Sequence, residues 1–378
     1  MVRVEEISRH KVHPNIPSET QRLRDQSANW LNPVVKKLHD IGIFKDIKSL
    51  DDIQVDSIEP LTGGIKSAAY WIGIPGNEVV IKFDFLGFQV ESEWLRTYEA
   101  NGVDVPRVLL TGTSVSEDQS AAQFIVLQGV VDEKKKRAKT GREVEDNPIF
   151  YKEVSRLMGV ELAKIHSTST AKAFGSYDDN PEKTFTTKTW QEFLKRFLDS
   201  EKLTEFGISA DDVSQLLSAL DRVEFPEQGS YISGDFALHN LLIEAVNPPK
   251  FKIIDPIGMI GDPYFDIATL YNSDELNQRL REIRIRENLD VKEYPLTWVE
   301  KDPFDLQSFL EAYIKESGIT IDTRRLIANQ IIAMIRTYDQ KNKYITPNQS
   351  AEKQRSIDLQ FSIRRELIKE KISALISS

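Results

Sequence analysis

The feature that most constrains the fold is a change in hydrophobic pattern partway along the chain. Before about residue 128 the chain has short runs rich in β-branched and aromatic residues, punctuated by Gly63-Gly64 and Pro75-Gly76. We expect strands at Ala68–Ile74, Glu78–Phe83 and Phe124–Leu127. Beyond Tyr151 the apolar residues recur at helical spacing, as in Leu306, Phe309, Leu310, Tyr313 and Ile314, which follow a predicted helix cap at Asp305. Strand-rich sequence followed by helical sequence predicts an α+β protein whose strands and helices are segregated.

Three regions follow from this pattern. Residues 1–52 are predicted to form a helical N-terminal extension, because Ser18 and Gln21 have capping-box spacing and Asn32-Pro33 resembles a second helix start. Residues 53–128 form the predicted β-rich lobe, interrupted by one helix at about Gly87–Ala100. Residues 129–378 form the predicted helical lobe, with a basic run at Lys134–Lys139 that we expect in an exposed loop. This lobe also has β-like runs at Tyr231–Ile232, Leu241–Glu244 and Phe251–Ile254.

Composition indicates the class of protein but says little about the reaction it catalyses. The 378 residues are 40% hydrophobic, and the longest apolar runs are far shorter than the roughly 20 residues of a membrane-spanning helix. The N-terminal residues lack the apolar core of a secretory signal, so we expect a cytoplasmic protein without a membrane partner. A net charge of −10 disfavours broad binding to nucleic acid. Since the chain has no cysteine, catalysis must use carboxylates, Lys, Ser, Thr or the five histidines.

The strongest chemical signal is a polar loop between two predicted strands. Ser233-Gly234-Asp235-Phe236-Ala237-Leu238-His239-Asn240 precedes an apolar run, and Lys252-Ile253-Ile254-Asp255 ends the next one. Phosphoryl transfer needs a carboxylate beside the attacking hydroxyl and hard oxygen ligands for Mg²⁺. We predict that Asp235 orients or deprotonates the hydroxyl, and that Asn240 and Asp255 bind the metal.

These residues resemble the aminoglycoside phosphotransferase family, which includes antibiotic, choline and sugar kinases. The resemblance extends from about residue 58 to residue 270. The segments that carry it are Gly234-Asp235 through Asn240-Leu241-Leu242-Ile243, Ile254-Asp255-Pro256, Gly261-Asp262-Pro263-Tyr264-Phe265-Asp266-Ile267-Ala268, Met158-Gly159, Leu162-Ala163-Lys164-Ile165-His166-Ser167 and Val103–Leu109. It implies a protein-kinase-like bilobed fold and Mg²⁺-dependent transfer of phosphate to a hydroxyl group.

The resemblance also implies a nucleotide site in the β-rich lobe. Gly63, Gly64 and Ser67 lie in a segment similar to the family's nucleotide-covering loop, although Gly63-Gly64 alone would more often be a hairpin turn. Gln128 and Val130 lie in the connection that reads the base of ATP or GTP through backbone groups. Lys82, at the end of a strand, is expected to contact the phosphates.

A kinase lysine of this type pairs with a glutamate on the following helix. Two candidates exist, and helical geometry separates them. Glu91 shares a face with Trp94, Leu95 and Tyr98, whereas Glu93 aligns with Thr97 and Ala100. We therefore predict that Glu91 faces inward and pairs with Lys82, the alternative being that both acids are solvated.

Other polar residues are predicted to have structural roles. Asp266 resembles the family position that braces the catalytic loop, and His166 is expected to be a hydrogen-bonded structural residue at a helix end. His239 is predicted to pack within the loop. One departure from the family is Ser233, where members usually carry His.

The predicted activity is a small-molecule kinase that transfers the γ-phosphate of ATP or GTP to a hydroxyl. The alternatives are a protein kinase or a catalytically weak kinase-like module. The short spacing between Asp255 and Gly261 leaves little room for a peptide-positioning loop. The acceptor stays open, because acids after Asp266 are explained equally by a cationic substrate and by a solvated helix face, namely Asp274, Glu275, Glu282 and Glu287.

Overall fold

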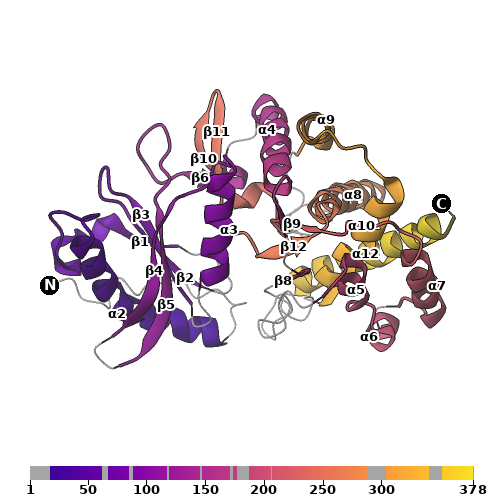
Figure 1. Ribbon diagram of the computed structural model, residues 1–378, viewed down its shortest axis with the longest axis horizontal. Helices are drawn as coiled ribbons and strands as arrows, with labels where there is room; N and C mark the ends of the chain where they lie inside the picture. The colour runs from indigo at the N-terminus through magenta and orange to yellow at the C-terminus, as the bar shows by residue number, and fades with distance from the viewer. Residues whose placement is uncertain are drawn as a thin grey trace. The chain divides into compact units, whose positions relative to one another are not determined.

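A computed structural model describes residues 18–61, 67–84, 88–116, 119–144, 147–170, 173–176, 187–205, 207–287, 304–339 and 351–377. The chain divides into two compact units, which are described separately. Unit 1 comprises the described residues of Met1–Glu143 together with Leu241–Ile254, and unit 2 comprises those of Val144–Asn240 and Asp255–Ser378. Figure 1 labels their helices and strands. The division of the chain after residues 52 and 128 stays a prediction.

Unit 1 is built on a five-stranded antiparallel sheet of order β1-β2-β3-β5-β4. Its strands are β1 (Ile58–Leu61), β2 (Ala68–Ile72), β3 (Val79–Asp84), β4 (Val108–Val115) and β5 (Ala121–Gln128). Along β3 the side chains of Val79, Ile81 and Phe83 are buried, and the period of two turns Lys82 to the other face. The predicted strands are therefore confirmed, with β1 and β4 in addition.

Helix α2 (Ser18–Asp40) contains Pro33, so the predicted second helix start at Asn32-Pro33 is wrong. The buried residues Trp30, Leu31, Val34, Val35 and Leu38 run through the proline on one face and join an apolar cluster with residues of the sheet. Packing on both sides of Pro33 therefore outweighs the helix hydrogen bond that its missing N–H cannot make. The Asn32 side chain instead accepts a hydrogen bond from the Leu50 amide at 3.0 Å. Figure 1 shows α2 beside the sheet.

The remaining elements of unit 1 are helix α3 and a second, smaller sheet. Helix α3 (Gln89–Ala100) is the predicted helix, beginning two residues later than expected. The small sheet has the order β11-β10-β6, formed by β6 (Lys139–Thr140), β10 (Leu241–Val246) and β11 (Pro249–Ile253). The basic run forms an exposed turn in which Asp132 Oδ1 accepts the amides of Lys134 and Lys136 at 2.9 Å each, and Lys139 then enters β6. Short 3-10 helices are η1 (Leu50–Asp52), η2 (Val55–Ser57) and η3 (Gly141–Glu143).

Unit 2 is mostly helical. Its four-stranded sheet has the order β7-β9-β12-β8, from β7 (Ser169–Thr170), β8 (Gly175–Ser176), β9 (Gly229–Ile232) and β12 (Met259–Gly261). Its helices are α4 (Pro148–His166), α5 (Trp190–Lys195), α6 (Ser200–Glu205), α7 (Ala210–Leu220), α8 (Tyr264–Glu287), α9 (Leu306–Ser317), α10 (Thr323–Asp339) and α12 (Ala351–Ser377). Asp305 caps α9, as predicted, by accepting the Ser308 amide at 2.8 Å.

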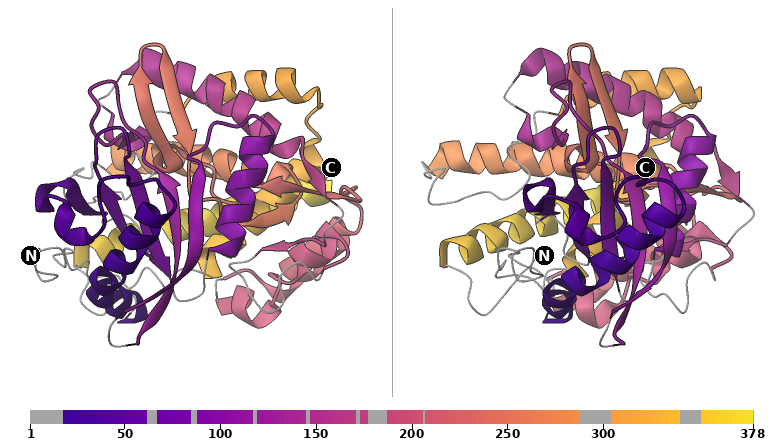
Figure 2. Two further views of the ribbon diagram at one scale, coloured as in Figure 1. Left: turned by 60° about the vertical axis from the view of Figure 1, so that its left-hand side comes forward. Right: turned by 90° about the vertical axis from the view of Figure 1, so that its left-hand side faces the viewer.

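The core of unit 2 explains how its helices hold the site. Residues of α5, α7, α8, α10 and α12 share one apolar cluster, and Figure 2 shows α12 running beside α10. Helix α4 packs closely on α9, because Gly159 has no side chain and a Cβ there would meet the Phe309 carbonyl at 2.3 Å. Within the described ranges, no helix combines the length and apolarity that a bilayer-crossing segment requires.

Candidate active site

Asp235 lies in the loop that joins β9 to the short 3-10 helix η5 (Leu238–Asn240). The Asn240 side-chain amide donates to the Asp235 carbonyl oxygen at 2.8 Å and to its carboxylate at 3.2 Å. His239 Nε2 lies 3.3 Å from the same carboxylate oxygen, Oδ2. The Asp235 side chain is still 44% exposed. The loop therefore fixes this carboxylate and leaves part of it open to a substrate.

The protonation of Asp235 follows from these neighbours. Burial alone would raise the pKa of Asp235, but the hydrogen bond and charge of His239, the Asn240 amide and the positive charge of Arg336 outweigh burial and lower its pKa. The group is consequently a carboxylate at neutral pH. It can accept a hydrogen bond from a hydroxyl group.

Asp266, in the first turn of α8, holds the loop that carries Asp235. Its side chain is fully buried and accepts the backbone amides of Ser233 at 2.8 Å and Gly234 at 2.7 Å. Gly234 has a φ of +75°, and a Cβ there would lie 2.7 Å from the sulfur of Met259. Two features therefore require glycine at this position: the positive φ of the backbone and the lack of space for a Cβ.

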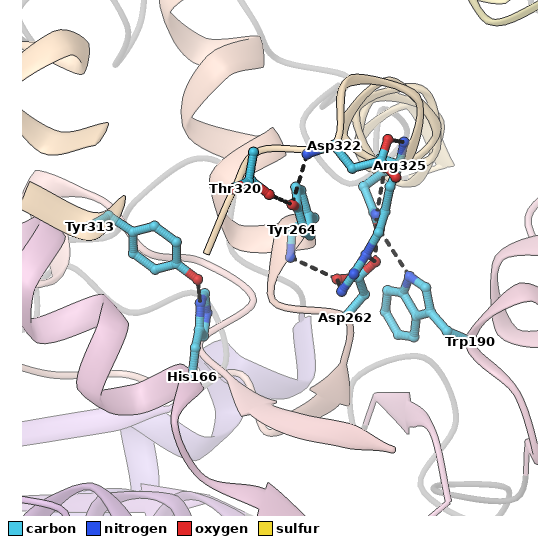
Figure 3. A network of polar contacts seen from close by, with 9 residues as sticks. His166, Trp190, Asp262, Tyr264, Tyr313, Thr320, Asp322 and Arg325 are labelled. Carbon is cyan, nitrogen blue, oxygen red and sulfur yellow. Dashed lines mark hydrogen bonds and ion pairs between the residues drawn. The ribbon is translucent and has the colours of Figure 1, made fainter. Parts of the chain in front are cut away.

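His166 connects Asp266 to helix α9. Its Nε2 lies 3.1 Å from Asp266 Oδ2, and its Nδ1 lies 2.9 Å from the Tyr313 hydroxyl, as part of the network in Figure 3. Burial and the nearby Asp266 raise the pKa of Tyr313 far above the ordinary tyrosine range, so its hydroxyl keeps its proton. His166 can then accept from Tyr313 at Nδ1 and donate to Asp266 at Nε2. Both residues are arranged as supports of the loop.

Asp255 and Asn240 are the predicted metal ligands. Asp255 is exposed and has a φ of +54°, a conformation uncommon for residues other than glycine. The segment after it is tied to the loop that carries Asp235, because the Ile257 amide donates to the Ser233 carbonyl at 2.9 Å. The amide nitrogen of Asn240 is turned to Asp235, so its side-chain oxygen is the atom left for a cation. Two hard oxygen donors suit Mg²⁺. No group of three or more His, Cys, Asp or Glu side chains gathers as a metal site among the described residues.

In unit 1, Lys82 and Glu91 form an ion pair. The Lys82 ammonium lies 2.8 and 3.0 Å from the two Glu91 carboxylate oxygens, and the side chains are only 13% and 14% exposed. The same ammonium lies 5.8 Å from the centre of the Phe88 ring. The helical geometry of α3 thus correctly separated Glu91 from Glu93. The role of this pair in nucleotide binding stays a prediction.

The other predicted nucleotide residues are also in unit 1. Gly63 and Gly64 lie outside the described residues, and Ser67 lies directly before β2. At the end of β5, the Gln128 amide donates to the Arg107 carbonyl at 2.9 Å. The carbonyl of the buried Val130 accepts the Ala138 amide at 2.9 Å. These two backbone groups are therefore engaged within the chain.

Sequence reasoning missed several residues around the loop. His239 was predicted to pack within the loop, but its ring contacts the Asp235 carboxylate. The buried Arg336 of α10 lies 3.5 Å from the Met259 sulfur and contributes positive charge at Asp235. A Gly-Asp-x-x-x-His spacing could have suggested the first contact. No local pattern signals the second, because α10 lies far along the chain.

The comparisons with known proteins first define the class. A thermostable variant of the aminoglycoside phosphotransferase APH(4)-Ia, in ternary complex with AMP-PNP and hygromycin B, shares 16% identity with a TM-score of 0.51, over 91% of this chain and 97% of that one. A predicted fructosamine-3-kinase from Haemophilus somnus 129PT shares 15% identity with a TM-score of 0.53, over 90% and 97% of the two chains. The fold is therefore the protein-kinase-like fold of these phosphotransferases, with an N-terminal helix, an antiparallel sheet and a mostly helical C-terminal part.

The family follows from the sequence. The profile of the "Phosphotransferase enzyme family" matches residues 57–313, which is more than half of the chain. The chain belongs to this family. A search of curated protein sequences found no match.

Proposed function

We propose that this protein is a small-molecule kinase that transfers the γ-phosphate of ATP or GTP to a hydroxyl group of its substrate. The observation that carries the proposal is the state of Asp235: a lowered pKa, a partly exposed carboxylate, and fixed contacts to Asn240 and His239. A carboxylate held in this way can orient an acceptor hydroxyl and accept its proton as the oxygen attacks phosphorus. Orientation of the attacking group is the main contribution a protein makes to this reaction.

Binding of the donor phosphates and of the metal is assigned to named side chains. Lys82, held in place by Glu91, would bind the α- and β-phosphates. Asn240 and Asp255 would hold Mg²⁺, which when bound neutralises charge on the phosphate oxygens. The AMP-PNP in the APH(4)-Ia complex supports a nucleoside triphosphate as the donor.

A small acceptor is supported by the segment after Asp255. Only a short irregular stretch separates Asp255 from β12, which begins at Met259, and this leaves no length for a loop that positions a peptide. The hygromycin B of the APH(4)-Ia complex is a small hydroxylated molecule.

The acids of α8 do not support a cationic acceptor. Glu275 pairs with Lys371 at 2.8 Å, Glu287 with Arg286 at 3.0 Å, and Asp274 accepts from Gln278 at 2.8 Å. These contacts engage Glu275 with α12 and the other two acids within α8, so they fit side chains that the chain itself satisfies. The proposed acceptor is therefore defined by its hydroxyl group and not by its charge.

The test is a screen for nucleotide consumption with Mg²⁺ and a panel of hydroxylated antibiotics, sugars and amino alcohols. We expect one acceptor to accelerate consumption and to appear as its phosphate ester by mass spectrometry. Asp235→Asn should remove this turnover while nucleotide binding, followed by calorimetry, stays within about twofold. Asp211→Asn, an exposed acid on α7, is the matched control and should have wild-type turnover. Equal turnover by Asp235→Asn and wild type would refute the assignment of Asp235 to the acceptor hydroxyl.

A further inference from the structure

A second buried carboxylate, Asp262, lies just before α8 and is fully enclosed. Arg325 of α10 binds it through two nitrogens, with Nη2 at 2.6 Å from Oδ1 and Nε at 2.7 Å from Oδ2. The Asn329 side chain donates to Oδ2 at 3.0 Å, and its oxygen accepts the Trp190 indole N–H at 2.9 Å. Burial alone would lower the pKa of Arg325, but the Asp262 carboxylate outweighs it and raises the pKa. We call Asp262, Arg325 and Asn329 the clamp, and Figure 3 labels Asp262 and Arg325.

The clamp controls where α8 begins. Asp262 Oδ1 accepts the Tyr264 amide at 2.9 Å, and the Asp262 carbonyl accepts the Phe265 amide at 2.9 Å. Asp262 therefore caps the helix that carries Asp266 one turn later. The Arg325 guanidinium also lies 4.3 Å from the centre of the Tyr264 ring.

Tyr264 locks the start of α8 to the start of α10. Its hydroxyl donates to the Thr320 carbonyl at 2.9 Å and accepts the Asp322 amide at 2.9 Å. Asp322 in turn accepts the Arg325 amide at 3.1 Å. The first turn of α8 is thus fixed by α10 on one side, and by Tyr313 of α9 through His166 on the other. Both sides border one pocket of about 560 Å³, whose lining includes His166, Tyr264, Tyr313 and Arg325.

We propose that Arg325 is a positioning residue for the catalytic loop: through Asp262 it sets the first turn of α8, and so the Asp266 carboxylate that holds Ser233 and Gly234. This proposal rests on the proposed kinase function for its consequence, though not for its geometry. Arg325 lies beyond residue 313, where the family match ends. The reaction should depend on it because small displacements of a positioned group can lower a rate by about 100-fold.

The identity of the residue matters as well as its charge. Two parallel N–H groups of a guanidinium fit both oxygens of a carboxylate, whereas a lysine ammonium offers a single charged point. Arg325→Lys should therefore keep the ion pair and the fold while loosening the orientation of Asp262. A purely structural ion pair would tolerate this change better than a positioning one.

The test measures amide hydrogen exchange of the segment Ser233–Asn240 in the full-length protein by mass spectrometry. We expect Arg325→Lys to accelerate exchange in this segment about tenfold, and Arg325→Met to accelerate it further, because a charge-assisted contact is weakened or lost. Lys371→Met is the matched control, since it removes the cation that α12 pairs with Glu275 of α8, and the Lys371 side chain is 12% exposed against 21% for Arg325. It should leave exchange in this segment unchanged.

Kinetics give a second, separate readout. With an acceptor in hand, Arg325→Lys should lower kcat at least about tenfold and leave the KM for nucleotide unchanged. The proposal is overturned if loop exchange in Arg325→Lys equals that of wild type, or if Lys371→Met accelerates it equally. Because exchange needs no substrate, failure of the kinase assignment would leave the exchange result intact, so the two failures are distinguishable.

Discussion

Asp266→Asn is the most demanding test of the site's architecture, because it changes a single buried atom. The carboxylate accepts the Gly234 amide on Oδ1, and the Ser233 amide and His166 on Oδ2. An asparagine has one acceptor and one donor in the same space. If its NH₂ replaces Oδ1 it faces the Gly234 N–H, and if it replaces Oδ2 it faces the Ser233 N–H. In either orientation one backbone amide of the catalytic loop is left buried without an acceptor.

The magnitude follows from the burial of this group. Asp266 is 0% exposed, so solvent cannot replace the lost hydrogen bond. Loss of a charged acceptor together with an unsatisfied buried donor costs about 3–5 kcal/mol of unfolding free energy. For a unit of this size that corresponds to a decrease in Tm of roughly 6–20 °C.

The assay is thermal unfolding followed by circular dichroism, with Asp235→Asn as the comparison. Asp235 is partly exposed, so its variant should lose less Tm than Asp266→Asn while lacking turnover. Asp266→Asn should lose both stability and turnover. A Tm for Asp266→Asn within about 2 °C of wild type would refute the reasoning, because it would mean that the loop amides have another acceptor.

Other predictions follow from the same geometry. The folded pKa of Asp235 lies below the ordinary value of about 3.9, so its ionised form stabilises the fold above that pH. This contribution is lost as the pH falls through the folded pKa. The unfolding free energies of wild type and Asp235→Asn, measured by urea titration, should therefore converge in acid. Glu91→Gln should weaken nucleotide binding or turnover about tenfold by releasing Lys82, while Glu93→Gln should not, and equal effects would reject the pairing as functional. Gly234→Ala should lower both Tm and turnover, because the added Cβ clashes with Met259. Thermal unfolding and nucleotide consumption measure these effects, and wild-type values would show that the loop can shift. Chelation of divalent cations should stop turnover reversibly, with activity restored by added Mg²⁺.

Local sequence patterns predicted much of the fold. The β-rich run Glu78–Phe83 identified β3, and the spacing of apolar residues identified α9 with its Asp305 cap. The same reasoning separated Glu91 from Glu93, because a helix presents side chains at fixed angles. In contrast, Pro33 was predicted to start a helix and lies inside one. Tertiary packing, which a local signal does not contain, decided that case.

The candidate site was predictable in Asp235 and in the bracing contacts of Asp266, but not in the contacts that Tyr313 and Arg325 add. Asp235 follows from the loop sequence around it. Tyr313 and His166 are 147 positions apart in the sequence, and Arg325 and Asp262 are 63 apart. No periodic pattern in the sequence signals a contact between residues so far apart. Such contacts arise from the packing of α8, α9 and α10, which only the three-dimensional structure reveals.

The discontinuity of unit 1 has a consequence for synthesis of the protein. Strand β6 ends at Thr140, but its partner β10 begins at Leu241, after the stretch Val144–Asn240 that belongs to unit 2. At roughly 5–20 residues per second, the ribosome would take on the order of 5–20 s to deliver that partner. Until then residues 139–140 lack the strand with which they pair, so the small sheet of unit 1 can form only after this stretch of unit 2 has been synthesised.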